Sequence, residues 1–250
     1  MGREEIISKC KILLDAYHSG KLGYMKMPED ASPEFNDKET RLVYFTLPMS
    51  LNYQRDSYKL WASTLKTFQD PEARIIFDIK SSATLQEDKL REYLTRYKVA
   101  LQPNKHIATW QKISKTILEN WGSILNLLES ADHDFLKLKN IVQIQFKKGF
   151  PYLSGPKIFN YWSFILQEYG KIKLKNAEYI EIAPDTHVTK CSVILGVITK
   201  EEAESLSKEN ISEKWRLLLK GTGINPIDMH PPLWFWSRNG FQFKISRLPM

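Results

Sequence analysis

Apolar residues recur at the spacing of α-helices along much of this chain, and this periodicity constrains the fold more than any other feature. Near the N-terminus the apolar positions are Ile6, Ile7, Cys10, Leu13, Leu14 and Tyr17. A second apolar stripe follows Pro103 and comprises Ile107, Trp110, Ile113, Ile117, Trp121, Ile124 and Leu128. Strand-like patterns are confined to residues 74–79 and 179–183, and either stretch could instead be an extended loop. We therefore expect a mainly α protein.

Proline and polar residues predict where some of these helices are interrupted. A loop rich in Gly, Pro and Asp is expected from Ser19 to Asp37. Residues 40–69 are expected to be helical with a break at Pro48, because proline removes a backbone hydrogen bond and clashes with the preceding turn.

Two helix starts have the spacing of a capping box, in which two side chains bond each other's backbone N–H groups. Thr84 with Glu87 predicts a helix through Tyr97. Thr199 with Glu202 predicts another.

Length and composition fit one large domain or two small lobes, because 250 residues with 42% apolar content can bury a full core. Cys10 and Cys191 cannot form a disulfide framework, and no Cys or His cluster has the spacing of a metal site, so we expect no metal and no cofactor. We expect no signal peptide, because the first residues open an amphipathic stretch, and no apolar run approaches the ~20 residues of a membrane span. The expected location is the cytoplasm, in association with the nucleoid if the source is prokaryotic.

Positive charge is concentrated in one window of the chain. The formal net charge is +7, and between residues 137 and 175 Glu168 is the only acidic residue. The lysines of this window are Lys137, Lys139, Lys147, Lys148, Lys157, Lys171, Lys173 and Lys175. Such a window would attract a phosphate backbone. The alternative is a solvated lysine-rich surface without a partner.

Lys157 and Asp185 are the candidate catalytic residues. Lys157 ends a Gly-Pro-Lys turn between two apolar helical stretches, and Asp185 lies in Pro-Asp-Thr-His-Val at residues 184–188. A neutral lysine amine can form a Schiff base with a sugar C1′, and a carboxylate can stabilise the positive charge that develops at that carbon. A helix N-terminus beside the lysine and burial against aromatic rings would favour the neutral amine. The alternative is that Lys157 is a solvated residue at a helix start and Asp185 is a helix N-cap.

Two motifs carry a resemblance to a known superfamily. Residues 150–157 (Phe-Pro-Tyr-Leu-Ser-Gly-Pro-Lys) resemble the hairpin of the helix-hairpin-helix DNA glycosylases, and residues 184–188 resemble the Val-Asp-Thr-His-Val motif of the same superfamily. The hairpin is one residue longer, and Tyr152 replaces its usual first Gly. Residues 222–226 and Leu233-Trp234 are similar to the C-terminal region of the archaeal 8-oxoguanine DNA glycosylases.

The resemblance implies a two-lobed helical fold with a cleft between the lobes. Residues 39–157 would form most of one lobe, and residues 1–38 with 158–250 most of the other. It also implies a monomer that acts on damaged double-stranded DNA. The activity would be release of an oxidised purine, 8-oxoguanine first, followed by β-elimination at the abasic site.

The resemblance also assigns roles to individual residues. Lys157 would form the Schiff base and Asp185 would stabilise the sugar cation. The base-binding residues would be Tyr161, Trp234, Trp61 and His230, where the archaeal enzymes have Asp at the position of His230. The DNA-binding residues would be Gly155, Ser154, Lys147, Lys148, His187 and Gln54. Members of this superfamily often place residues that fill the gap left by the extruded base in the loop that here holds Asn52, Tyr53 and Gln54. The alternative is that this polar run is an ordinary loop. Two other functions remain open: a catalytically silent DNA-binding module, and a structural or protein-binding helical domain.

Overall fold

The computed structural model describes residues 2–245. In this range it has thirteen α-helices, and it has no strand, only an isolated bridge between Asp134 and Lys175. The mainly α prediction is confirmed. Neither candidate strand forms: residues 74–77 lie in the 3-10 helix η2 (Ala73–Phe77), and residues 180–183 are coil, which is the loop alternative for that stretch. Both stretches bury apolar side chains as strands would, but their backbones have no neighbouring strand to pair with.

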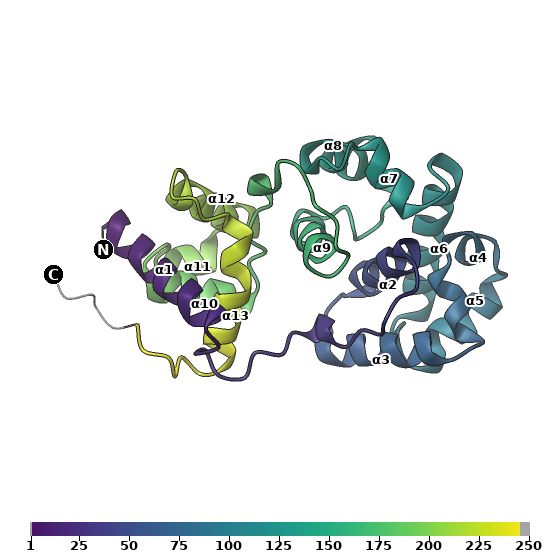
Figure 1. Ribbon diagram of the computed structural model, residues 1–250, viewed down its shortest axis with the longest axis horizontal. Coiled ribbons are helices and arrows are strands. Elements are labelled where there is room, and N and C mark those ends of the chain that lie inside the picture. The colour runs from purple at the N-terminus through teal and green to yellow at the C-terminus, as the bar shows by residue number, and fades with distance from the viewer. Residues whose placement is uncertain (1, 246–250) are drawn as a thin grey trace. The chain divides into compact units, whose positions relative to one another are not determined.

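The chain divides into two compact units, visible in Figure 1 as the helices α2 to α9 and the helices α1 and α10 to α13. The larger unit is Met27–Asn176. The terminal unit is formed by both ends of the chain, up to Lys26 and from Ala177 onward. The division thus falls near residues 26 and 176, whereas the sequence suggested residues 38 and 157, and α9 (Pro156–Glu168) belongs to the larger unit.

Helix α2 (Lys38–Leu51) is the central helix of the larger unit, and every residue from Leu42 to Leu51 is buried. It contacts α3 (Ser57–Gln69), α6 (Pro103–Asn120), α7 (Ile124–Ser130) and α9. The predicted break at Pro48 is wrong, because the helix continues through this residue to Leu51. A proline inside a helix costs ~3 kcal/mol or more. Burial of the whole segment against four helices offsets that cost.

Three other predicted boundaries have different outcomes. Thr84 does not cap the next helix: it ends α4 (Ile79–Thr84), and its hydroxyl donates to the Lys80 carbonyl. Helix α5 (Glu87–Arg96) begins without a side-chain cap. The predicted stripe 107–128 is divided between α6 and α7 by a turn at residues 121–123. By contrast, Thr199 and Glu202 form the predicted capping box of α11 (Lys200–Ser205).

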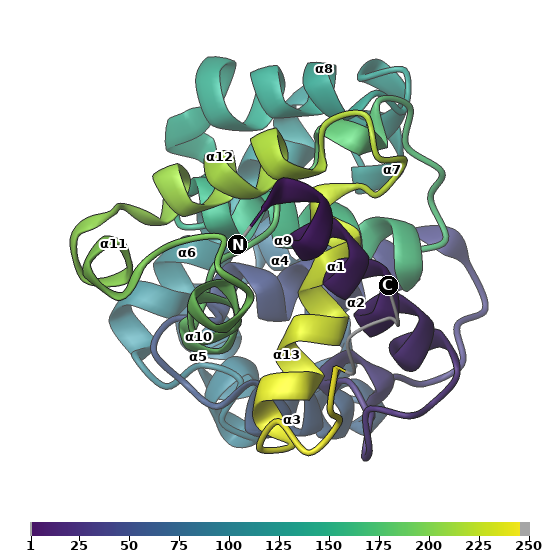
Figure 2. The ribbon, with the colours of Figure 1, turned by 90° about the vertical axis from the view of Figure 1, so that its left-hand side faces the viewer.

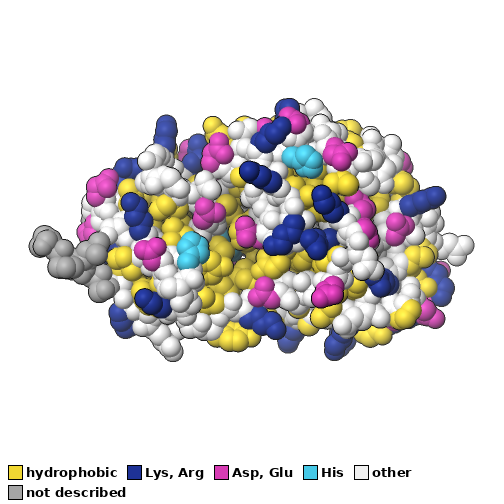
Figure 3. All heavy atoms as spheres, viewed as in Figure 1, with side chains coloured by type: hydrophobic (Ala, Val, Ile, Leu, Met, Phe, Trp, Pro, Cys, Tyr) yellow, Lys and Arg dark blue, Asp and Glu magenta, His cyan; other side chains and the backbone are white. Residues whose placement is uncertain are grey.

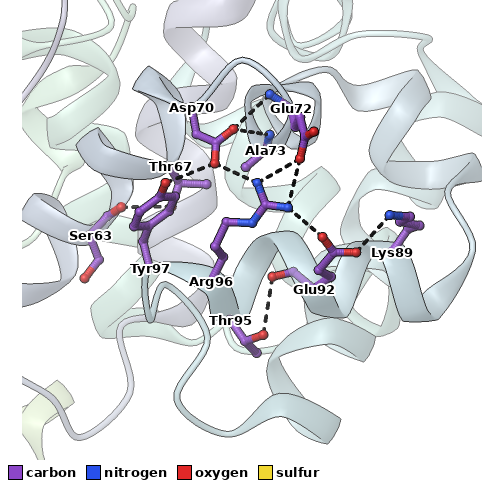
Figure 4. A network of polar contacts seen from close by, with 10 residues as sticks. All are labelled: Ser63, Thr67, Asp70, Glu72, Ala73, Lys89, Glu92, Thr95, Arg96 and Tyr97. Atoms are coloured by element: carbon purple, nitrogen blue, oxygen red, sulfur yellow. Dashed lines mark hydrogen bonds and ion pairs between the residues drawn. The ribbon is translucent and has the colours of Figure 1, made fainter.

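An ion-pair network joins α5 to the segment that follows α3 (Figure 4). The Arg96 guanidinium contacts Asp70, Glu72 and Glu92 at 2.8, 3.0 and 2.6 Å. The Tyr97 hydroxyl also donates to Asp70. Arg96 holds the pKa of Asp70 at about 2, so this carboxylate stays ionised over the ordinary pH range. The network fixes the edge of the larger unit.

In the terminal unit α1 (Arg3–His18) lies alongside α13 (His230–Arg238), as Figure 2 shows. Helix α13 also packs against α10 (Thr186–Leu195). Helix α12 (Lys208–Leu219) joins this core through the Trp215 indole, which donates to the Ser192 hydroxyl at 2.8 Å. No helix among residues 2–245 is both long and apolar enough to cross a membrane.

Candidate active site

A tight turn at residues 150–155 precedes α9. The Ser154 N–H donates to the Phe150 carbonyl, and the Gly155 N–H donates to the Tyr152 carbonyl. The Ser154 side chain is buried and its hydroxyl donates to the Lys147 carbonyl. Ser154 and Gly155, the two predicted DNA-binding residues of the turn, therefore donate these hydrogen bonds to groups within the protein. Gly149 lies so close to α6 that a Cβ there would be 2.5 Å from Thr116 Cγ2.

The helical segment before this turn is irregular. Helix α8 (Phe135–Asn140) continues into a π-helical stretch (Ile141–Gln145) and then a 3-10 turn (Lys147–Gly149). π-helical stretches occur frequently at functional sites. Gln143, inside the π-helical stretch, donates to the Ser154 carbonyl at 3.0 Å and so connects this segment to the turn.

Helix α9 presents Lys157 on its first turn. Phe159 and Trp162 face the core, where the Trp162 indole donates to the Thr46 hydroxyl of α2 at 3.0 Å. Lys157 is exposed, so the expected burial of this residue is not found. The helix N-terminus remains, and its positive partial charge disfavours an ammonium ion at this position.

Tyr161, one turn after Lys157, reaches a buried carboxyl that sequence analysis did not select. Its hydroxyl donates to Glu29 Oε1 at 3.2 Å. Glu29 lies in the 3-10 helix η1 (Pro28–Asp30), which packs against α3, and its side chain is almost completely buried. Trp61, on α3, is fully buried among Tyr44 and Phe45. The structure thus brings Tyr161, Trp61 and Glu29 together in the larger unit.

Glu29 and Trp61 each have a polar atom without a hydrogen bond. Among the described residues, Glu29 Oε2 and Trp61 Nε1 are buried and have no partner. Burial raises the pKa of Glu29 from 4.5 to about 7, against the opposing effects of its own backbone N–H, the Tyr161 hydroxyl and the Trp61 indole. The indole is therefore close to the carboxyl, although the two atoms do not meet hydrogen-bond geometry. A buried unsatisfied polar group costs about 1–3 kcal/mol, so a ligand that bonded to these two atoms would remove that cost.

The buried carboxyl predicts a pH dependence of stability. Between the pKa of about 4.5 in the unfolded chain and about 7 in the folded chain, only the folded state keeps the Glu29 proton, so the free energy of unfolding falls as pH rises. Each pH unit costs about 1.4 kcal/mol, or roughly 3 kcal/mol over the interval. Glu29→Gln should lack this contribution. In denaturant titrations at pH 5, 6, 7 and 8, the free energy of unfolding of the variant should rise relative to that of the wild type as pH rises. A difference between the two proteins that stays constant with pH would contradict the assignment. Exposed Glu34→Gln is the control.

Asp185 begins α10 in the terminal unit. Its side chain accepts from the Val188 N–H at 2.8 Å, so it is the N-cap that the alternative interpretation predicted. An N-cap carboxylate has a second oxygen, so capping does not exclude another role. Asp185 belongs to the terminal unit, whereas Lys157 belongs to the larger unit.

Helix α13, which packs against α10, carries the predicted base-binding residues Trp234 and His230. The His187 ring packs edge-on against Trp234 at 5.6 Å, and its Nδ1 lies 3.0 Å from the Ser237 hydroxyl. Trp234 is half-buried, with the Arg238 guanidinium 4.9 Å from its ring centre. His230 is buried at the start of α13. His187 and Trp234 are thus neighbours in the terminal unit.

The predicted DNA-binding residues Lys147, Lys148 and Gln54 are all exposed. Part of the lysine window is neutralised, because Asp132 pairs with Lys137 at 3.3 Å and with Lys175 at 2.7 Å. On the face shown in Figure 3, Lys and Arg side chains are interspersed with Asp and Glu. The charge excess of the sequence window is therefore only partly an excess at the surface.

No protein-family model matches this sequence, and a search of curated proteins finds no match. Function is therefore inferred from the residues of the site.

Proposed function

We propose that the protein is a DNA glycosylase with abasic-site lyase activity, of the two-lobed helix-hairpin-helix type, that removes an oxidised purine from duplex DNA. It would act as a monomer in the cytoplasm, or at the nucleoid of a prokaryote. The observation that carries the proposal is the arrangement around α9. Lys157 is on its first turn, and Tyr161 on the next turn contacts Glu29, whose second oxygen and the nearby Trp61 indole have no hydrogen-bond partner.

Glu29 and Trp61 complement one edge of 8-oxoguanine. This base presents an N7–H donor beside its O8 acceptor, whereas guanine has an acceptor at N7 and no oxygen at C8. The Glu29 carboxylate would accept from N7–H, and the Trp61 indole would donate to O8. Because both atoms are shielded from solvent, the base reaches them only when covering side chains move. Tyr161 and Trp234 would supply ring faces for stacking, and His230 a further polar contact.

The proposed reaction uses Lys157 and Asp185. The neutral Lys157 amine attacks C1′ of the extruded nucleotide, the bond from C1′ to the base breaks, and the base leaves with the bonding electrons and takes up a proton. The Asp185 carboxylate stabilises the positive charge that develops on the sugar. Loss of the amine proton and opening of the sugar ring give an imine. Removal of a C2′ proton then expels the 3′ phosphate by β-elimination.

A panel of lesion duplexes tests the substrate. Single-turnover base release should be fastest with 8-oxoguanine, slower with other oxidised purines, and absent with undamaged guanine. Glu29→Ala should lose base release while retaining nicking at a preformed abasic site, because that substrate has no base to recognise. Release of damaged pyrimidines alone would contradict the proposal. Glu34→Ala, at an exposed position, is the matched control.

A catalytically silent DNA-binding module is the second candidate. The exposed Lys147 and Lys148 beside the turn favour DNA as the ligand without requiring chemistry. Duplex binding that weakens steeply with salt, with neither base release nor strand nicking, would favour this function.

A further inference from the structure

Tyr152 adopts a backbone conformation that is unusual for its residue type. Its φ is +64°, in the left-handed region, where a side chain costs about 1–2 kcal/mol and which glycine adopts without that cost. Such strain persists only where the surrounding structure holds the residue in place, and it concentrates at functional sites. The turn thus keeps a backbone conformation suited to glycine with a large aromatic residue in its place.

The Tyr152 side chain connects the turn to a loop that is distant in sequence. Its hydroxyl donates to the Asn52 carbonyl, 100 residues away. Its ring meets the Tyr53 ring edge-on, with centres 5.6 Å apart and planes at 90°. Burial raises the pKa of Tyr152 to about 12, so the hydroxyl keeps the proton that it donates. One side chain therefore fixes residues 52 and 53 to the turn that precedes Lys157.

The loop is held from its other side as well. Arg55 donates to the Lys98 carbonyl at 2.9 Å, and Lys105 Nζ lies 4.3 Å from the centre of the Tyr53 ring. Between these anchors Gln54 is exposed, with a φ of +46°. Gln54 is thus a polar side chain presented at the tip of a short loop whose flanking residues are all fixed.

We propose that Tyr152 is a positioning residue that fixes the Gln54 loop relative to the Lys157 turn, so that Gln54 enters the space left by the extruded nucleotide while that nucleotide meets α9. This inference rests on the proposed function for its substrate. Extrusion from a duplex costs a few kcal/mol, whereas a base that is already unpaired costs least. A group that fills the gap must also sit at a fixed distance from the reaction centre, since a 1 Å misplacement can cost about a hundredfold in rate. Loss of the Tyr152 contacts should therefore slow base release from paired lesions and have little effect on release from unpaired ones.

The test compares the same lesion in duplex and in single-stranded DNA. Tyr152→Phe removes only the hydroxyl, and Tyr152→Gly removes the side chain while suiting the backbone conformation. In single-turnover assays each variant should lower base release from the duplex by about tenfold or more, the effect of losing one well-placed hydrogen bond, and leave single-stranded DNA within about twofold. Tyr24→Phe, at a largely exposed tyrosine, is the control. Equal losses on both substrates, or no loss on duplex, would overturn the inference.

A double-mutant cycle shows whether Tyr152 acts through the loop. Gln54→Ala should produce the same duplex-specific loss, and Tyr152→Phe should add little in the Gln54→Ala background, because coupled residues are not additive. Additive losses would mean that Tyr152 does not position Gln54 and would overturn the inference.

A measurement without catalysis separates this inference from the proposed function. With 2-aminopurine as the target base, wild-type protein should increase its fluorescence by unstacking it from the duplex, and Tyr152→Phe should reduce the increase. This result from a protein that releases no base would retain the positioning role and reject the glycosylase. A wild-type protein that leaves 2-aminopurine stacked would overturn the positioning role.

Discussion

Replacing Lys157 with Gln is expected to abolish strand nicking at abasic sites and to slow base release by roughly a thousandfold or more, because an amide cannot form an imine and loss of a nucleophile has effects at least this large. The fold should tolerate the change. Lys157 is exposed on the first turn of α9, whereas Phe159 and Trp162 anchor that helix in the core. Removing a positive charge from a helix N-terminus does not weaken the helix. Gel assays of base release and nicking under single-turnover conditions measure both effects.

Lys115→Gln is the matched control, because it removes one exposed lysine charge from α6 in the same unit. It should retain both activities. If Lys157→Gln also retains nicking within about tenfold of the wild type, another group forms the imine and the assignment of the nucleophile fails.

Replacing Asp185 with Asn should slow base release by about a hundred- to a thousandfold, which is the effect of removing one group that stabilises developing charge. The substitution separates charge from structure. Asp185 caps α10 through the Val188 N–H, and Asn caps helices about as well as Asp, so folding should be preserved. Since Lys157 is unchanged, imine formation at a preformed abasic site should persist.

Asp78→Asn gives the matched control for capping, because Asp78 caps α4 through the Ser81 N–H at 2.7 Å. It should leave base release unchanged. A rate for Asp185→Asn equal to that of the wild type would mean that Asp185 only caps its helix. A large fall in thermal stability with Asp185→Asn would attribute the loss of activity to folding instead.

The presence of helices could be predicted from sequence, because helix formation depends on the pattern of neighbouring residues. Some helix boundaries depend on residues that are distant in the chain. The apolar positions of α1 and the capping box at Thr199 are local signals, and both predictions are confirmed. Pro48 also gives a strong local signal, but burial of α2 by helices from later in the chain outweighs it. Thr84 has the right spacing for a cap, yet it is already the last residue of α4.

The residues of the candidate site could likewise be predicted only where the signal is local in sequence. Lys157 and Asp185 stand in recognisable motifs, so they could be selected before the structure was known. Glu29 could not, because its importance comes from burial and from contact with Tyr161, 132 residues later in the chain. An acidic residue next to Asp30, inside a predicted loop, gives no sequence signal of that kind. Tyr152 departs from the hairpin pattern in the sequence, but its bond to Asn52 spans 100 residues and is evident only from the structure.

Borohydride trapping shows whether Lys157 forms a covalent intermediate, because an imine between Lys157 and C1′ is reducible and a non-covalent complex is not. Wild-type protein should be incubated with a duplex containing 8-oxoguanine, and separately with one containing an abasic site, in the presence of borohydride at several pH values. We expect a stable protein–DNA adduct on both substrates, with the link mapped to Lys157 by mass spectrometry and absent from Lys157→Gln. A wild-type protein that binds both duplexes but forms no adduct at any pH would contradict the proposed Lys157 imine.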